Sequence, residues 1–497
     1  MTFFDKLQKK GFTALKQEKH TSHVEIRKTA VPSQRFIHPI HSKRSKAEHS
    51  QSRPHTANTS RRQKPLLVNA SKDRLRQGQK RASTASQSPM WGSDDDASDE
   101  DLTSNNKRQK MDSTVEPDLE RTIRSQTAFS DEVDIDFKMV HAADIANVEK
   151  PKEFKLAFPD FPEVKNIYLQ YPSASPREKY ELVYPRSEDD FKSLEDIRLV
   201  MEKVAAYYLP PDIADAVTDD STGLIRRLKR ATKNFAADDY CDCIREWNDL
   251  LHEAGTNGTL ETVIKGWKTV DLELCEFILT QSYARTVSLM VNDLRKYKNG
   301  EDNVYGELLP KFVSTILKKD LIMKADQVFV DLGSGVGNVV LQAALEVGCE
   351  SWGCEEMQNA HNLAVRQKSE FEARCRLWGL SKGDIHLVEG DFLKNDEIKA
   401  VLKRADVVLV NNQAFTPALN DQLTYHFLDL KDGAKVVSLK SFAPTGQQGQ
   451  SRSAGAIHNI LDVSEKRYYS GCVSWTNASG TYYIASKGST KVKAFNG

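Results

Sequence analysis

The chain has 497 residues, of which 28% are charged and 39% are hydrophobic, and its 70 basic side chains balance its 70 acidic ones. This length exceeds one compact domain, so we expect two domains, or one large domain with tails. No apolar run reaches membrane-spanning length, no signal-peptide core is found, and the seven scattered cysteines lack C-x-x-C pairing. We therefore expect an intracellular protein without a membrane partner, a disulfide framework or a metal.

The first 150 residues predict a disordered segment whose charge changes sign along its length. Residues 1–90 are poor in aliphatic residues and hold about 20 Lys and Arg against about 5 Asp and Glu. Such a basic arm is typical of binding to DNA phosphates, and the basic clusters at 61–64 and 107–110 would also serve as nuclear-import signals. Residues 93–101 (SDDDASDED) begin an acidic and polar linker, which is either solvated or a patch for a basic partner. Both interpretations of the arm place the protein in the nucleus.

Residues 151–300 predict a mainly helical lobe. Short strands are expected between Phe154 and Tyr184. Ser187 and Asp190 resemble a capping box that starts a helix ending before Pro210. Two further helices are expected over about 222–254 and 260–297.

Residues 301–490 alternate strands with helices, which indicates a doubly wound, largely parallel sheet. The predicted strands are 328–331, 350–354, 385–388, 406–410, 434–439 and 481–486. The predicted helices are 307–318, 338–346, 358–377, 395–402, 417–428 and 455–461.

The stretch 328–338 (VFVDLGSGVGN) is the strongest local signal in this domain. A strand leads into Asp331, and Gly333 and Gly335 then open a turn before a helix. Glycines let the backbone approach a ligand closely, and the helix start offers free N–H groups. The G-x-G-x-G spacing differs from the dinucleotide motif, and an acidic residue before the glycines suits a cationic ligand. This pattern favours S-adenosylmethionine.

Polar residues at the ends of the next strands support that interpretation. Glu355 can accept hydrogen bonds from the ribose hydroxyls, Asp391 can accept one from the adenine amino group, and Phe392 can stack on the ring. Asn411 and Asn412 follow the fourth strand. Taken singly, Asp391 could cap a helix, Phe392 could be core, and the asparagines could form a turn. Together they predict a class I S-adenosylmethionine-dependent methyltransferase fold, Rossmann-like, behind the helical lobe.

Over residues 155–490 the chain resembles the disruptor-of-telomeric-silencing family of histone lysine methyltransferases. The segments that carry the resemblance are 304–308 (VYGEL), 331–338 (DLGSGVGN), 353–355 (GCE), 411–412 (NN), 438–441 (SLKS), 473–476 (VSWT) and 482–483 (YY). The family usually has an aromatic residue after the two asparagines, where this chain has Gln413.

The resemblance implies methylation of lysine 79 of histone H3 in nucleosomes, and with it roles in chromatin silencing and the DNA-damage response. It implies a nucleosome partner, DNA held by the basic arm, and a contact with ubiquitinated histone H2B. The cofactor-binding residues that it implies are Tyr305, Gly306, Glu307, Asp331, Gly333, Gly335, Asn338, Glu355, Asp391, Phe392 and Asn411. The implied catalytic residues, which line the lysine channel and close the cofactor site, are Asn411, Tyr305, Trp475 and Tyr482.

Two alternatives stay open on the sequence. A methyltransferase acting on nucleic acid or a small molecule could share the fold. However, DNA amino-methylating enzymes carry an Asp/Asn-Pro-Pro-aromatic motif where this chain reads 411–414 (NNQA). A chromatin-binding scaffold with a dead fold is disfavoured, because the cofactor-facing positions bear usable side chains.

Overall fold

The computed structural model describes residues 118, 121–130, 137–163, 166–291, 294, 306–442 and 461–488. All of these residues belong to one compact unit of the chain. The predicted basic arm and the acidic stretch lie outside the described residues. No described helix is long and apolar enough to cross a membrane.

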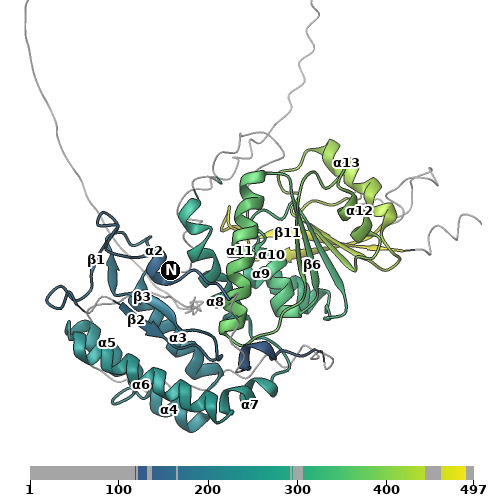
Figure 1. Ribbon diagram of the computed structural model, residues 1–497. Coiled ribbons are helices and arrows are strands. Elements are labelled where there is room, and N and C mark those ends of the chain that lie inside the picture. The colour runs from purple at the N-terminus through teal and green to yellow at the C-terminus, as the bar shows by residue number, and fades with distance from the viewer. Residues whose placement is uncertain are drawn as a thin grey trace, which may run out of the picture. The chain divides into compact units, whose positions relative to one another are not determined.

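A seven-stranded sheet forms the centre of the C-terminal half (Figure 1). Its strands are β5 (Val328–Leu332), β6 (Glu350–Glu355), β7 (Ile385–Glu389), β8 (Val407–Val410), β9 (Lys435–Ser438), β10 (Leu461–Tyr468) and β11 (Gly480–Lys487). The order is β10-β11-β9-β8-β5-β6-β7, with β5 to β9 parallel and the β10–β11 hairpin antiparallel. Since β5 lies between β6 and β8, the strand order reverses there, which is where such sheets bind ligands.

Both faces of the sheet are buried at its central strands β5 and β8, which explains why these two strands read as apolar runs. In β5, Phe329 joins one apolar cluster, while Val330 and Leu332 join another on the opposite face. The helices that cover the faces are α9 (Pro310–Ser314), η3 (Thr315–Asp320), α10 (Asn338–Gln342), η4 (Ala343–Val347), α11 (Gln358–Leu377), α12 (Asp396–Leu402), α13 (Pro417–His426) and η5 (Phe427–Asp429). The six predicted strands and five of the six predicted helices are thus confirmed in place.

Strand β10 was not predicted. The helix expected over 455–461 falls outside the described residues, apart from Leu461, which opens β10 instead. This strand pairs only with β11, so it is an edge strand, and most of its middle is exposed and polar. Its two buried apolar residues, Leu461 and Tyr468, stand at its ends, so no apolar alternation marks it in the sequence.

The N-terminal half is mainly helical, with two small antiparallel strand pairs. Its elements are η1 (Thr127–Phe129), α2 (Ala142–Ile145), β1 (Phe154–Leu156), β2 (Asn166–Leu169), β3 (Glu178–Glu181), β4 (Val183–Pro185), α3 (Ser193–Tyr207), α4 (Pro211–Thr218), α5 (Leu224–Lys233), α6 (Ala237–Thr256), α7 (Thr259–Lys265), α8 (Leu272–Arg285) and η2 (Ser288–Met290). The short strands expected between Phe154 and Tyr184 are therefore confirmed.

Three helix boundaries in this half differ from the prediction. The helix expected over 222–254 is broken at Phe235, whose φ of 54° lets α6 fold back against α5. The helix expected over 260–297 is divided between α7 and α8, and the Asp271 carboxylate caps α8 by accepting a hydrogen bond from Glu273 N. Helix α3 begins at Ser193, because Ser187 instead closes an upstream turn by accepting from Asp189 N. The break at Phe235 depends on packing of α6 against α5, whereas the other two boundaries are set by local side-chain hydrogen bonds.

Described structure also precedes residue 151, where the predicted linker ends. Ala325 N donates to the Asp118 carboxylate over 2.8 Å, Ser125 N donates to Gly379 O over 2.9 Å, and Ser381 N donates to Ile123 O over 2.6 Å. Asp118 and residues 121–130 are thus bound to the C-terminal half.

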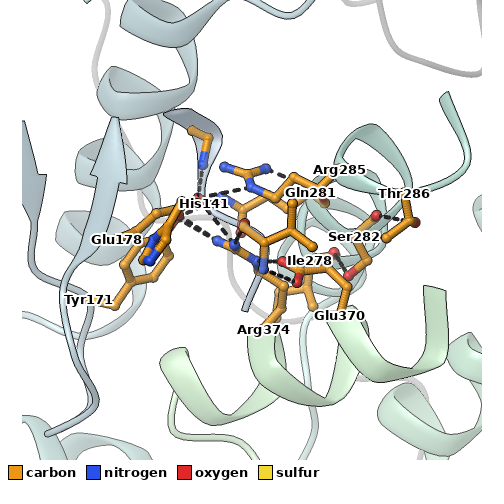
Figure 2. Close-up of polar contacts among 12 residues, drawn as sticks. His141, Tyr171, Glu178, Ile278, Gln281, Ser282, Arg285, Thr286, Glu370 and Arg374 are labelled. Carbon is orange, nitrogen blue, oxygen red and sulfur yellow. Dashed lines mark hydrogen bonds and ion pairs between the residues drawn. The ribbon is translucent and has the colours of Figure 1, made fainter. Parts of the chain in front are cut away.

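A buried ionic network joins the helical lobe to α11, the helix that follows β6 (Figure 2). The Glu178 carboxylate on β3 accepts hydrogen bonds from Arg285 on α8 and Arg374 on α11, and all three side chains are fully buried. Burial acts to raise the pKa of Glu178, but the two guanidinium groups outweigh it and lower this pKa to about 2. A second carboxylate, Asp196 on α3, pairs with Arg285 at 2.6 Å. The network fixes α8 and α11 beside the sheet.

Candidate active site

The glycine loop connects β5 to α10 at the carboxyl edge of the sheet. Gly333, Gly335 and Gly337 have φ angles of 86°, 55° and 84°, a region that side-chain-bearing residues rarely adopt. The N–H groups of Gly333 and Ser334 donate to Cys354 O at the end of β6, over 2.9 and 3.0 Å. The loop is therefore fixed to the neighbouring strand, and α10 starts directly behind it.

Two carboxylates flank this loop, the buried Asp331 and the half-buried Glu355. Glu355, at the end of β6, accepts hydrogen bonds of 2.8 Å from Gly335 N and from Met357 N. Burial raises the pKa of Glu355. Asp331 is 3% exposed, and its burial, with the nearby charge of Glu355, raises its pKa to about 8. Within the described residues neither carboxylate forms an ion pair, so this site has a deficit of positive charge and fits a cationic cofactor.

Asp391 and Phe392 follow β7, as predicted, but Asp391 does not cap a helix. It accepts from Leu393 N over 2.9 Å and pairs with Lys394 at 2.8 Å. Burial acts to raise the pKa of Asp391, but these hydrogen bonds outweigh it and lower the pKa. Helix α12 is capped by Asn395 instead. The Phe392 ring stacks on Phe415, with centroids 6.1 Å apart, and the contact of either predicted residue with adenine stays a prediction.

The segment 306–309 is held in a short ladder against 472–474. Glu307 N donates to Ser474 Oγ, Ser474 N donates to Glu307 O, and Leu309 N donates to Cys472 O, each over 2.9 Å. The Glu307 carboxylate also accepts from Asn338 Nδ2 at the start of α10, over 3.0 Å. Glu307 and Asn338 are thus placed together beside the glycine loop, whereas Tyr305 lies outside the described residues.

Asn411, Gly306 and Trp475 meet at the end of β8. Asn411 Nδ2 donates to Gly306 O over 2.9 Å, while Asn411 Oδ1 is buried and has no hydrogen-bond partner within the described part of the chain. The Trp475 ring lies so close to Gly306 that a Cβ there would be 2.7 Å from it. Tyr482 lies on β11, its ring packs on Phe312 with centroids 5.1 Å apart, and its hydroxyl donates to Asp320. Asn411 Oδ1, which has no partner among the described residues, is therefore a free acceptor close to the Trp475 indole ring.

Comparison with known proteins identifies the relatives of this chain. The family model described as "Histone methylation protein DOT1" matches residues 283–487. The H3 lysine-79 specific histone-lysine N-methyltransferase of Aspergillus fumigatus is 46% identical over 100% of this chain and 99% of that protein. The chain belongs to this family. The corresponding enzyme of Emericella nidulans is 51% identical over 78% of each chain, and that of Gibberella zeae is 45% identical over 85% of this chain and 87% of its own.

Two residues outside the predicted cofactor-binding and catalytic sets position the site of this DOT1 family member. Asn412 is fully buried, and its Oδ1 accepts from Leu439 N and Lys440 N over 3.0 and 2.8 Å, which ties the end of β8 to the end of β9. Gln367 on α11 donates to Asn338 Oδ1 over 2.6 Å and to Val336 O over 3.3 Å. The pair of adjacent asparagines in the sequence draws attention to Asn412, whereas no local sequence pattern indicates the role of Gln367.

The departure at Gln413 falls on an exposed side chain. Phe415, two residues further on, lies over the glycine loop, with its ring 3.7 Å from where a Cβ of Gly333 would stand. The departure from the family motif therefore lies at an exposed position of the chain.

Proposed function

We propose that this chain is a histone-lysine N-methyltransferase that transfers methyl groups from S-adenosylmethionine to lysine 79 of histone H3 in nucleosomes. One observation carries the proposal beyond the family: Asn411 Oδ1, at the strand edge that bears the glycine loop, is buried and has no hydrogen-bond partner among the described residues. A buried acceptor without a partner is costly unless a ligand satisfies it. A neutral lysine amine, which has N–H groups to donate, is such a ligand.

The cofactor site is supported by the charge deficit at the loop. Asp331 is buried and Glu355 half-buried, and neither has a cationic partner in the described chain, so a positively charged cofactor would stabilise their ionised forms. Around them, Gly333, Gly335 and Asn338 would hold the cofactor from the loop side and Glu307 from the ladder side, with Asp391 and Phe392 at the end of β7. When bound, S-adenosylmethionine supplies an electrophilic methyl group on a sulfonium.

The residues of the chain would then prepare the lysine. The Trp475 ring would exclude water around the ammonium, and this desolvation lowers the pKa of the lysine so that its proton leaves to solvent. Asn411 Oδ1 would accept a hydrogen bond from the amine and orient its lone pair. Catalysis would thus depend on alignment and desolvation rather than on a general base.

The nucleosome would be held at more than one point. The basic arm, residues 1–90, is proposed to bind DNA phosphates while the catalytic half reaches the histone surface, and ubiquitinated H2B is proposed as a further contact. The nucleus is the compartment that this substrate requires. Roles in chromatin silencing and the DNA-damage response are proposed on the same basis.

A labelled-methyl transfer assay on nucleosomes, free histones and naked DNA tests the proposal. We expect label on H3 only with nucleosomes, abolished by a lysine-79-to-arginine histone. The Gly335→Arg variant, whose side chain would block cofactor entry, should be inactive. Its thermal unfolding shows whether the φ of 55° at this position accepts a side chain. Label on DNA, or no label despite cofactor binding, would refute the function and leave the fold intact.

A further inference from the structure

The β10–β11 hairpin extends beyond the sheet edge that carries the glycine loop. Ser438, the last residue of β9, pairs with Tyr483, and the hairpin continues for three more pairs, to Gly480 opposite Tyr468. At about 3.4 Å per residue, it projects roughly 10 Å past the end of β9. Because β9 runs parallel to β8 and, through it, to β5, this is the edge where Asn411 also lies. We call residues 466–482 the finger.

The tip of the finger is held from both sides. The Tyr468 ring is 8% exposed and packs on Phe312 in α9, with centroids 5.1 Å apart. A Cβ at Gly480 would stand 2.4 Å from that ring, so only a glycine at position 480 leaves room for the Tyr468 ring. After the turn, Cys472 O accepts a hydrogen bond from Leu309 N, in the ladder between 306–309 and 472–474. Trp475 directly follows this ladder, and its ring lies against Gly306. The tip is therefore preorganised and connected to the site.

Tyr469 stands at this tip and is 77% exposed, the highest value among the large hydrophobic residues of the described chain. A single exposed tyrosine is ordinary on a protein surface. This one, however, is next to a locked residue, projects from the catalytic edge, and is six residues from Trp475, at most about 20 Å along the chain. Tyrosine gives a large amphipathic contact with little loss of side-chain entropy, which suits protein interfaces.

We propose that Tyr469 docks on the histone surface that flanks the methylated lysine, and that the finger thereby sets how a folded surface approaches Asn411. This inference rests on the proposed function and adds a substrate-positioning residue to it. A contact this far from the transferred methyl group is of use only with a folded substrate, because a flexible peptide would reach the channel without it. The finger would thus contribute to selection of the assembled nucleosome over a peptide.

The chain provides a matched control in Tyr425, which is 62% exposed on α13. Helix α13 starts after the carboxyl end of β8 and returns to the amino end of β9, so Tyr425, its penultimate residue, lies toward the opposite edge. Removal of either ring exposes no core, so both variants should fold.

Steady-state methylation of nucleosomes by wild type, Tyr469→Ala, Tyr469→Phe and Tyr425→Ala tests the proposal, alongside binding to nucleosomes and naked DNA. We expect Tyr469→Ala to raise KM for nucleosomes about five- to twentyfold with kcat nearly unchanged, since only a docking contact is lost. Tyr469→Phe should retain most of the affinity. S-adenosylmethionine binding, thermal stability and the Tyr425→Ala variant should match wild type.

Three outcomes would overturn the inference. An unchanged KM in Tyr469→Ala would show that the tip makes no contact. An equal loss of affinity for naked DNA would assign the tip to DNA instead of histone. No H3 methylation by the wild-type chain would refute the proposed function itself, and the finger with it, whereas an active wild type with an unaffected Tyr469→Ala would refute the finger alone.

Discussion

Replacement of Asp331 by asparagine is expected to stabilise the cofactor-free protein while weakening its affinity for S-adenosylmethionine. Burial and the charge of Glu355 raise the Asp331 pKa from 3.8 to about 8. Because the folded pKa lies above the unfolded one, the folded state holds the proton more tightly. The stability from this group is therefore full below about pH 4 and is lost as the pH rises toward 8. Each pH unit in this window costs about 1.4 kcal/mol.

Urea denaturation of both proteins at pH 5 and pH 7 measures this effect. The advantage of Asp331→Asn in unfolding free energy should grow by roughly 3 kcal/mol over these two units. In calorimetry, wild type should bind S-adenosylmethionine more tightly as the pH rises from 6 to 8, since only the ionised carboxylate attracts a cation. The variant should bind weakly at every pH. A stability difference independent of pH, or equal cofactor affinities, would refute the charge-deficit argument.

Three other changes test separate parts of the molecule. Asn411→Ala should lower the single-turnover rate about 100-fold and leave S-adenosylmethionine affinity nearly intact, because the amide aligns the amine; an unaltered rate would remove Asn411 from the channel. Glu178→Gln should lower the free energy of unfolding by about 3–5 kcal/mol, since two buried guanidinium groups lose their shared countercharge. The control Glu372→Gln breaks a half-exposed pair with Lys382 and should cost under about 1 kcal/mol; similar losses would contradict a special role for the network. Deletion of residues 1–90 should weaken nucleosome binding and flatten its salt dependence without changing cofactor affinity, and unchanged nucleosome affinity would reject the DNA arm.

The parallel sheet was predictable because the features that define it, apolar strands followed by polar residues, are visible in short stretches of sequence. Strands β5 and β8 are buried on both faces, so their apolar runs are continuous, and the polar residues that follow them reach one edge by topology alone. Helix α11 was predicted with its observed limits, 358–377. Asp331, Glu355 and Asn411 could be assigned to one site for the same reason.

Most features that the sequence did not predict depend on contacts with residues elsewhere along the chain, which local sequence patterns do not reveal. The φ of Phe235 is set by the packing of α6 on α5, and Gln367 acquires its role only when α11 passes the glycine loop. The Tyr482 hydroxyl is likewise bound by Asp320, from a helix 162 residues earlier. Strand β10 was missed because an edge strand with exposed polar faces has no apolar period.

The network around Glu178 also has a consequence for synthesis on the ribosome. Its carboxylate is separated by 107 residues from Arg285 and by 196 from Arg374. The helical lobe therefore emerges with a buried acid that lacks its second guanidinium until α11 has been made. We expect the lobe to stay incompletely folded, and to need protection by chaperones, until α11 has left the exit tunnel. The two halves would then mature as one cooperative body, not in succession.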